Sequence, residues 1–254
     1  MNSDLPLQNR NILVTGATGG IGKAIVIRVA QLGGYPIVHF RSNEEAARKL
    51  LAQIEGKGTL VQENLDHPEG ADRLWQKSEK EIGRIHSLVN NAGIRSRANV
   101  TDDLAHWSRA WEADLRVNLR APADLSRLAV RHFASHGGGQ IVNIASRAAQ
   151  RGYTEDHMPY GASKAGLLNL TKSIARSFGK DGVVAVAVSP GFVRTEMAEQ
   201  FIAAKGKMAA LGDIPIGEMV EPKEVAELVC FALRPDQKSL SGATLDINGA
   251  SYVR

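Results

Sequence analysis

The sequence contains a single cysteine, Cys230, among 254 residues, so the chain cannot form an internal disulfide. Cys230 lies in an apolar run, and we expect it to be a buried structural thiol. No apolar run approaches the ~18 residues that a membrane span requires. Residues 1–8 lack both a basic start and an apolar stretch of signal length. We therefore expect a cytoplasmic protein with no membrane partner.

Aromatic residues are scarce, at 5%, and the charged residues are scattered along the chain. The net charge of +4 permits acidic partners. However, no stripe combines basic and aromatic residues, so we expect no nucleic-acid binding. The seven histidines are also scattered, without the spacing of metal ligands, and we predict no metal site. The positive charge suits a phosphorylated cofactor equally well.

Short apolar runs alternate with stretches of helical periodicity along the whole chain. The predicted strands are 11–15, 36–40, 59–63, 86–90, 140–144, 183–188 and 243–247. The predicted helices are 21–32, 44–54, 70–82, 102–136, 158–179, 195–216 and 221–233. This alternation predicts an α/β fold, with a Rossmann-type doubly wound parallel sheet of about seven strands and helices on both faces. We expect residues 1–254 to form a single domain, in which 195–216 is a helical insert that covers the substrate.

A glycine-rich turn separates the first predicted strand from the first predicted helix. Gly16, Gly20 and Gly22 have the spacing Gly-x-x-x-Gly-x-Gly. Glycine lets the backbone approach a pyrophosphate, and the helix N-terminus that follows supplies free N–H groups and a positive dipole. A tight turn without a ligand is the alternative, but the strand–turn–helix context favours a dinucleotide site.

The end of the second predicted strand indicates which dinucleotide is used. A cofactor without a 2′-phosphate usually meets an acidic residue there. In this chain Arg41 and Ser42 stand at that point, and a guanidinium with a hydroxyl suits a phosphate. We therefore predict that NADP(H) is preferred over NAD(H). The alternative is that Arg41 is a solvated loop residue.

Tyr160 and Lys164 are four residues apart in a predicted helix and therefore share one face of it. A tyrosine hydroxyl titrates near pH ~10, and a nearby ammonium group favours the phenolate. The pair can therefore serve as a general acid/base near neutral pH. By itself the spacing also fits a solvated pair worth ~0.3 kcal/mol. The order of the other motifs decides between the two.

With these motifs in this order, the chain resembles the short-chain dehydrogenase/reductase family across essentially its whole length. The matching positions are Thr15-Gly-x-x-x-Gly-x-Gly22, Asn90-Asn-Ala-Gly93, Asn118, Ser146, Tyr160-x-x-x-Lys164, Pro190-Gly191 with Thr195, and Leu245-Asp-Ile-Asn-Gly249. The resemblance implies that Tyr160 protonates the carbonyl oxygen and that Ser146 hydrogen-bonds it. It implies that Lys164 holds the nicotinamide ribose and lowers the pKa of the tyrosine. Asn118 would kink its helix and bind a water that passes protons to Lys164.

The resemblance also implies which residues contact the cofactor. These are Gly16, Thr18, Gly19, Gly20, Ile21, Gly22, Arg41, Ser42, Asn64, Leu65, Asn91, Ala92, Gly93, Tyr160, Lys164, Pro190, Gly191, Val193 and Thr195. Gly19 departs from the many NADP-dependent members that have a basic residue there, which leaves phosphate recognition to Arg41 and Ser42. A plain proline turn at Pro190 and a helix N-cap at Thr195 are the alternatives for those two positions.

The loops after Gly93, Ser146 and Gly191 are expected to form the walls of a substrate pocket. They contribute Arg95, Arg147, Gln150, Tyr153, Phe192 and Met197. The arginines would attract an anionic substrate, or they are solvated loop residues.

The chain looks most like the 3-oxoacyl-(acyl-carrier-protein) reductase branch. That likeness implies reduction of a 3-oxoacyl thioester in fatty acid biosynthesis, with an acyl carrier protein as partner. A basic residue that helps to dock the carrier in that branch is Asp181 here, which weakens this assignment.

Other interpretations stay open. The substrate could be the carbonyl group of a sugar, polyol, steroid or diketone. The chain could also be a non-catalytic dinucleotide-binding sensor, although sensors commonly lose the Tyr or the Lys. The family usually assembles as homotetramers, and we expect a homotetramer or homodimer that uses 102–136 and the helix of Tyr160.

Overall fold

The computed structural model describes residues 5–195, 198–199, 202–203, 206 and 211–254. Within these residues, parallel strands form one sheet. They are β1 (Asn11–Val14), β2 (Tyr35–Phe40), β3 (Thr59–Gln62), β4 (Ser87–Asn90), β5 (Gly139–Ile144), β6 (Val183–Pro190) and β7 (Thr244–Ile247). The seven strands pair in the order β3-β2-β1-β4-β5-β6-β7, and every pairing is parallel. The predicted Rossmann-type α/β fold is therefore confirmed.

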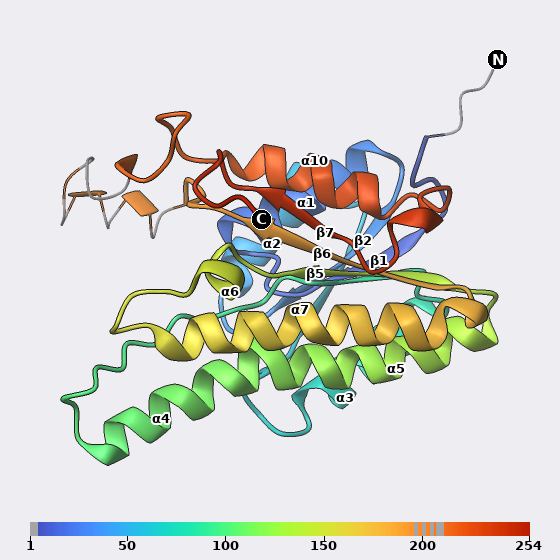
Figure 1. Ribbon diagram of the computed structural model, residues 1–254. Helices are drawn as coiled ribbons and strands as arrows, with labels where there is room; N and C mark the ends of the chain where they lie inside the picture. The colour runs from blue at the N-terminus through green and yellow to red at the C-terminus, as the bar shows by residue number, and fades with distance from the viewer. Residues whose placement is uncertain (1–4, 196–197, 200–201, 204–205, 207–210) are drawn as a thin grey trace.

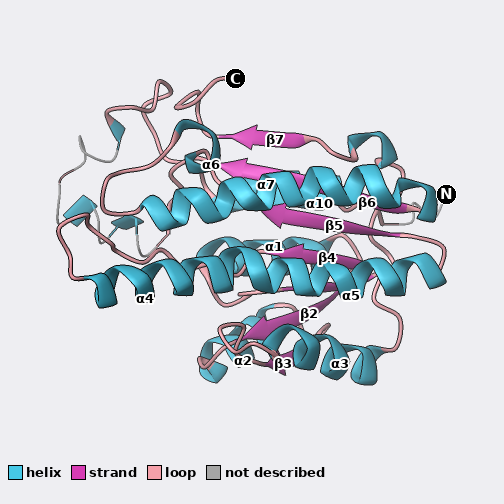
Figure 2. Ribbon diagram, turned by 60° about the horizontal axis from the view of Figure 1, so that its bottom comes forward, coloured by secondary structure: helices cyan, strands magenta, loops and turns pink. Residues whose placement is uncertain are grey.

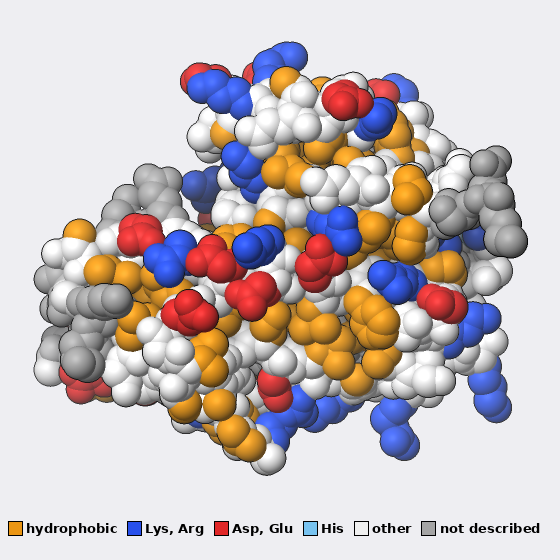
Figure 3. All heavy atoms as spheres, turned by 90° about the horizontal axis from the view of Figure 1, so that it is seen from above, with side chains coloured by type: hydrophobic (Ala, Val, Ile, Leu, Met, Phe, Trp, Pro, Cys, Tyr) orange, Lys and Arg blue, Asp and Glu red, His pale blue; other side chains and the backbone are white. Residues whose placement is uncertain are grey.

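Helices cover both faces of the sheet (Figures 1 and 2). The α-helices are α1 (Gly20–Gln31), α2 (Glu44–Gln53), α3 (Gly70–Ile82), α4 (Leu104–Leu115), α5 (Ala121–Ser135), α6 (Ala148–Arg151), α7 (Met158–Phe178) and α10 (Pro222–Ala232). The short turns η1 (Arg116–Arg120), η2 (Gly179–Asp181) and η3 (Lys238–Leu240) complete the named elements. Figure 1 shows α1 and α10 above the sheet and α4, α5 and α7 below it. Seen from above, the upper face carries interspersed side chains of both charge signs (Figure 3).

Alternating side chains of the strands build one hydrophobic cluster on each face. Along β1, Ile12 and Val14 pack with apolar residues of α1 and α10, whereas Leu13 packs with those of α3 and α5. β6 is buried along its whole length, as expected for a parallel strand covered on both faces. Cys230 on α10 is 1% exposed, and burial raises the pKa of its thiol to about 12. The cysteine is thus the buried thiol that its apolar surroundings predicted.

The strand order reverses beside β1, and this reversal positions the site. The chain runs outward from β1 to β2 and β3, then returns to β4 on the other side of β1. At such a switch point the loops after the strands separate and leave a crevice at the carboxyl edge of the sheet.

Two helical segments differ from the predicted boundaries. The helix predicted at 102–136 is interrupted by the π-helical turn η1, which contains Asn118. A π-turn adds one residue to a turn, so the 3.6-residue period alone does not reveal it. α6 follows Ser146 where no helix was predicted, and its four residues are too few to show a period.

The helical insert predicted at 195–216 falls on a segment where 196–197, 200–201, 204–205 and 207–210 lie outside the described residues. Among the helices that the structure does describe, none is long and apolar enough to cross a membrane.

Candidate active site

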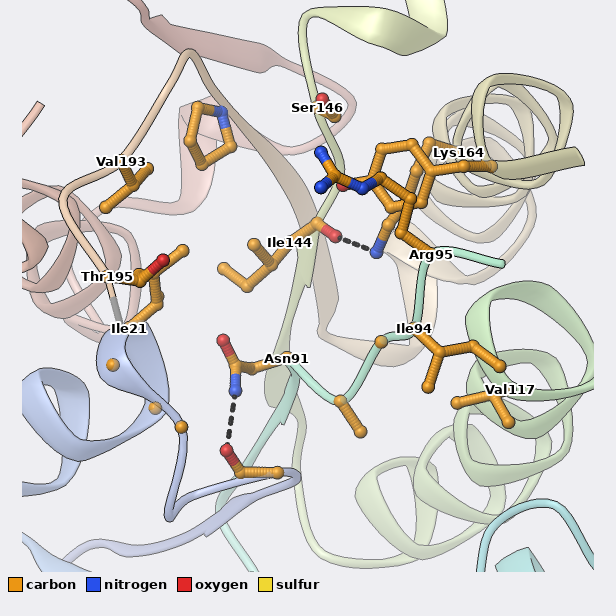
Figure 4. A pocket seen from close by; sticks show the side chains of 18 of the residues that line it. Ile21, Asn91, Ile94, Arg95, Val117, Ile144, Ser146, Lys164, Val193 and Thr195 are labelled. Atoms are coloured by element: carbon orange, nitrogen blue, oxygen red, sulfur yellow. Dashed lines mark hydrogen bonds between the residues drawn. The ribbon is translucent and has the colours of Figure 1, made fainter. Parts of the chain in front are cut away.

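A cavity of about 650 Å³ opens at the carboxyl edge of the sheet, and Figure 4 shows part of its lining. Most of the predicted site residues line it. They are Gly16, Thr18, Gly19, Gly20, Ile21, Gly22, Arg41, Asn64, Leu65, Asn91, Ala92, Gly93, Arg95, Ser146, Arg147, Tyr153, Tyr160, Lys164, Pro190, Gly191, Phe192, Val193 and Thr195. Loops that are far apart in sequence therefore meet around one space.

Three of the predicted residues that the structure describes are not part of this lining, and a fourth cannot be placed. Ser42 is exposed where the chain turns into α2, a helix capped by the side chain of Asn43. Gln150 lies on α6 and is absent from the lining. Asn118 is fully buried and contacts the loop after β4. Met197 lies outside the described residues.

The cavity is also lined by residues that no motif indicated, namely His39, Asp66, Ile94, Val117, Ile144, Ala145 and Ala198. His39 is the most informative, because its Nδ1 accepts a hydrogen bond from the Gly16 N–H at 3.0 Å. Its Nε2 therefore carries the proton and donates to the carbonyl oxygen of Glu63 at 3.1 Å. Burial lowers the pKa of His39 to about 4, so the ring is neutral near pH 7. His39 joins the loop of Gly16 to that of Glu63. The sequence did not indicate this role, because a single histidine in an apolar strand belongs to no motif.

The glycine turn is too tightly packed to accept side chains. Gly16 has a φ of +61°, a conformation that glycine adopts without strain. A Cβ atom at Gly22 would lie 2.4 Å from the Gly16 carbonyl oxygen and 2.7 Å from Asn91 Nδ2. Gly19 at the N-cap provides no side-chain hydrogen bond to α1. The N–H groups of the first turn therefore remain available to an anion, which fits a cofactor pyrophosphate.

Thr15 and Asn91 join the ends of β1 and β4 across the switch point. The Thr15 hydroxyl donates to the Val89 carbonyl oxygen at 3.2 Å and accepts from the N–H groups of Asn91 and Ala92, each at 2.9 Å. Asn91 Nδ2 donates in return to the carbonyl oxygens of Thr15 and Gly16, at 2.8 and 3.1 Å. These bonds hold the loop after β4 against the glycine turn.

The cavity contains an exposed arginine at the end of β2. Arg41 lines it, and among the described residues its guanidinium forms no ion pair. The neighbouring Arg48, by contrast, pairs with Glu44 at 2.5 Å. Arg41 is thus a cation available to a phosphate, as a 2′-phosphorylated cofactor requires.

The loop after β3 is held by the buried carboxylate of Glu63. Arg73 donates to it through Nη2 at 2.8 Å and Nε at 3.1 Å, and Lys77 Nζ donates at 2.9 Å. The Asn64 N–H donates to the same carboxylate at 2.9 Å. These bonds, that of Arg73 first, lower the pKa of Glu63 to about 2. Glu63 therefore stays ionised and fixes Asn64 at the cavity wall.

Tyr160, Ser146 and Lys164 meet where α7 packs against the end of β5. Tyr160 and Lys164 lie one turn apart on α7, and Ser146 lines the same cavity. Lys164 Nζ donates to the carbonyl oxygen of Ile144 at 2.8 Å (Figure 4). The same Nζ lies 5.8 Å from the centroid of the Tyr160 ring.

Burial dominates the electrostatics of this cluster. It raises the pKa of Tyr160 to about 12, although the Ser146 hydroxyl and the charge of Arg95 act in the opposite direction. Burial also lowers the pKa of Lys164 to about 8, against the influence of Asp114. Desolvation sets the direction of the shift, so the tyrosine pKa is raised and not lowered as expected from Lys164. Near pH 7 Tyr160 is protonated, which is the form that donates a proton.

Asn118 organises the loop after β4 from the π-turn. Its Oδ1 accepts from the Ile94 N–H at 2.8 Å, and its Nδ2 donates to the Ile94 carbonyl oxygen at 2.9 Å and to Ser163 Oγ at 3.1 Å. A Cβ atom at Gly93 would lie 3.2 Å from Asn118 Oδ1 and 3.4 Å from Lys164 Nζ. Asn118 thus shapes the loop directly beside Lys164.

The residues of the cavity fit an NADP(H) molecule. The tight glycine turn and the uncapped start of α1 suit its pyrophosphate, and Arg41 suits its 2′-phosphate. In the described part of the chain, no group of three or more His, Cys, Asp or Glu side chains is placed to hold a metal ion.

A sheet of this strand order, with an acid/base cluster beside its switch point, is the architecture of an oxidoreductase that works with a nicotinamide cofactor. Residues 10–206 match the short chain dehydrogenase family, and the chain belongs to that family. It is a dehydrogenase/reductase that acts on carbonyl and alcohol groups.

Individual relatives differ in what they act on. The chain is 31% identical to the 3-oxoacyl-(acyl-carrier-protein) reductase FabG of Vibrio cholerae, over 97% of this chain and 99% of the relative. It is 33% identical to cyclohexanol dehydrogenase of an Acinetobacter species, over 95% and 94%. The angucycline C-6 ketoreductase LanV, solved with bound NADP, superimposes with a TM-score of 0.87 at 26% identity, over 97% and 96%.

Proposed function

We propose that this protein is an NADP(H)-dependent oxidoreductase that transfers a hydride between the nicotinamide and a carbonyl or secondary alcohol, with a 3-oxoacyl thioester as its substrate. The observation that carries the proposal is that Ser146, Tyr160 and Lys164 line one cavity, with Lys164 one helical turn from Tyr160. This cluster supplies the acid that carbonyl reduction requires, beside a site that fits the cofactor.

The proposed roles follow from the proton that the reaction needs. When bound, the reduced cofactor supplies a hydride to the carbonyl carbon. As negative charge develops on the carbonyl oxygen, Tyr160 transfers its hydroxyl proton to that oxygen and is left as a phenolate. Ser146 donates a hydrogen bond to the same oxygen, and the ammonium of Lys164 stabilises the phenolate. Asn118 holds the loop beside Lys164 through its bonds to Ile94.

The preference for NADP(H) over NAD(H) is supported by Arg41, whose guanidinium lines the cavity and pairs with no acid among the described residues. The NADP bound to LanV supports the same choice. Ser42 is exposed next to Arg41.

The choice of a 3-oxoacyl thioester is supported by the full-length similarity to the reductase of Vibrio cholerae. The comparable similarity to cyclohexanol dehydrogenase supports a second candidate, a simple ketone or secondary alcohol. Asp181 on η2 is acidic where the acyl reductase branch has a basic residue. We therefore propose the thioester as substrate and only weak docking of an acyl carrier protein.

The test is NADPH consumption by the purified protein with acetoacetyl thioester, run beside NADH and beside cyclohexanone. Faster turnover with NADPH and thioester supports the full proposal. Turnover with cyclohexanone alone would transfer the assignment to simple ketones. Tight NADPH binding without turnover of either compound would contradict the thioester assignment and direct the search to sugars and steroids.

We also propose a homotetramer or homodimer. Leu104 and Leu115 on α4 are 78% and 36% exposed, and α4 itself packs against α7. Light scattering of the purified protein would contradict assembly if it gave the mass of one chain.

A further inference from the structure

Two arginines border the Tyr160–Ser146 cluster from different loops. Arg95 follows β4 and Arg147 directly follows Ser146, and both line the cavity. Figure 4 shows the Arg95 side chain extending from its loop toward Ser146. Burying a guanidinium group costs free energy unless an acid pairs with it. The groups that contact Arg95 and Arg147 therefore indicate which ligand the pocket can bind.

Side chains of α4 and η1 hold the backbone on both sides of Arg95. Asn118 bonds to both backbone groups of Ile94, at 2.8 and 2.9 Å. The buried carboxylate of Asp114 accepts from the Ser96 N–H at 2.9 Å. Arg95 is therefore presented by a fixed loop and not by a freely moving one.

Arg95 itself contacts only neutral groups. Its Nη1 donates to the Tyr153 hydroxyl at 2.8 Å, and the Tyr153 ring lies 5.6 Å from the Tyr160 ring. No carboxylate of the described residues pairs with it. Arg97, two residues along, is instead 74% exposed and lies 3.8 Å from the Asp156 carboxylate. Of these two arginines, the partly buried Arg95 is therefore the one without an acidic partner among the described residues.

The carboxylate that Arg147 contacts, that of Asp213, is shared with a second arginine. Its side chain is 9% exposed, and its Nη1 lies 3.4 Å from the Asp213 carboxylate. The same carboxylate receives a 2.6 Å bond from Arg151. Charge-assisted bonds of arginine are normally ~2.7–2.9 Å long, so the contact with Arg147 is weak. Burial, with a contribution from Arg151, lowers the pKa of Arg147, as expected for an incompletely paired cation.

We propose that Arg95 and Arg147 bind the carboxylate of a second class of substrate, an oxo acid whose carboxylate lies close to the carbonyl group. The inference rests on the proposed carbonyl reduction and adds the free 3-oxo acid to the thioester as a substrate. The segment after Ser146 already contacts a carboxylate, because Asp213 lies against Arg147 and Arg151. Two guanidinium groups on one carboxylate match its two oxygens and orient the adjacent carbonyl toward Tyr160.

Matched anionic and neutral substrates test this inference. The kcat/KM for NADPH-dependent reduction is measured with 3-oxobutanoate and with its ethyl ester, for the wild type and for Arg95→Gln. We expect the wild type to prefer the acid, and we expect Arg95→Gln to reduce the acid-to-ester ratio roughly tenfold to hundredfold. Arg97→Gln removes the same charge from the same loop outside the cavity and is expected to leave the ratio unchanged. An unchanged ratio in Arg95→Gln, with kcat reduced equally for both compounds, would overturn the inference.

Calorimetry separates this inference from the proposed reaction, because it does not need turnover. The NADPH-loaded protein is titrated with 3-hydroxybutyrate and with its methyl ester, neither of which NADPH can reduce. Binding of the acid that is lost in Arg95→Gln and in Arg147→Gln supports the anion site even if neither 3-oxobutanoate nor its ester is reduced. Equal binding of acid and ester by the wild type would overturn it, whether or not the protein reduces carbonyl groups. Because Arg147 is buried, Arg147→Lys serves as a second variant that retains the charge and should retain most of the binding.

Discussion

Lys164 donates a hydrogen bond from its Nζ to the carbonyl oxygen of Ile144 at 2.8 Å, and this bond joins α7 to the last residue of β5. Ser146 lies two residues beyond Ile144 on the same segment. The position of the acid/base helix relative to Ser146 is therefore set by the edge of the sheet. The Tyr160 hydroxyl takes no part in the bond between Lys164 and Ile144. Removal of this hydroxyl should therefore leave Lys164 and Ser146 in place.

Tyr160→Phe should reduce turnover by roughly 10²–10⁴-fold, because the proton donor is lost while the ring remains. Cofactor binding should persist, since the glycine turn and Arg41 are unaffected. Steady-state kinetics and fluorescence titration with NADPH measure the two effects. Tyr35→Phe at the start of β2 is the matched control. Unchanged turnover in Tyr160→Phe would remove Tyr160 from the mechanism.

Arg41→Ala should raise the KM for NADPH by roughly tenfold to hundredfold and weaken the preference over NADH. The physical reason is the loss of a charge-assisted bond to the 2′-phosphate, which NADH lacks. The measurement is the ratio of kcat/KM for the two cofactors. Arg48→Ala, which removes an exposed arginine already paired with Glu44, is the control and should not change that ratio. An equal loss with both cofactors would argue against phosphate recognition by Arg41.

Gly22→Ala should disrupt the glycine turn, because its Cβ would lie 2.4 Å from the backbone oxygen of Gly16. The backbone cannot move away without displacing the start of α1, so NADPH affinity and thermal stability should both fall. Differential scanning fluorimetry with and without NADPH measures both quantities. Gly179→Ala is the control, since no atom lies within 4 Å of a Cβ there. Normal NADPH affinity in Gly22→Ala would show that the turn accommodates a side chain.

Glu63→Gln should lower the free energy of unfolding near pH 7 by about 1–3 kcal/mol. The folded-state pKa of Glu63 is lowered from 4.5 to about 2, so its stabilising contribution is present above pH 4.5 and is lost as the pH falls toward 2. Between these values the unfolded chain binds more protons than the folded one, and stability therefore rises with pH. Urea unfolding of wild type and variant at pH 7 and pH 3 should show a difference that shrinks at the lower pH.

Glu45→Gln is the control for this prediction, because Glu45 forms only an exposed ion pair with Lys49. Exposed pairs contribute ~0–1 kcal/mol, so the variant should unfold nearly as the wild type does. A difference between Glu63→Gln and wild type that stays constant with pH would show that the effect comes from packing and not from ionisation.

Local patterns revealed those parts of the site that one segment specifies. Gly16 and Gly22 stand in a single turn, and Tyr160 and Lys164 stand on one helical face, so their spacing was sufficient to bring them into one prediction. His39 was missed because its two hydrogen bonds go to Gly16 and Glu63, which belong to the loops after β1 and β3. Such contacts depend on which strands are neighbours in the sheet. The spacing of residues within one segment does not specify the order of the strands.

The electrostatic state of the site likewise required the assembled fold. From sequence, Lys164 was expected to lower the pKa of Tyr160, since an opposite charge near a phenol favours the phenolate. In the structure, burial raises the pKa of Tyr160 instead, because the surrounding elements remove water from both side chains. Desolvation depends on everything packed around a group, and a sequence motif contains only the group itself.

The sequence by itself determined the alternation of strands and helices, the parallel sheet that follows from it, and the glycine turn and Tyr160–Lys164 pair that mark the family. These features arise from short-range periodicity and from the conformational freedom of individual residues. The tertiary structure alone decided which arginines lack an acidic partner. Arg95 and Arg97 are two residues apart and chemically identical. Within the described part of the chain, only Arg97 pairs with an acid, Asp156, while Arg95 lines the cavity beside Tyr153. That difference exists only after segments distant in sequence have packed together, because pairing and burial are properties of the assembled neighbours.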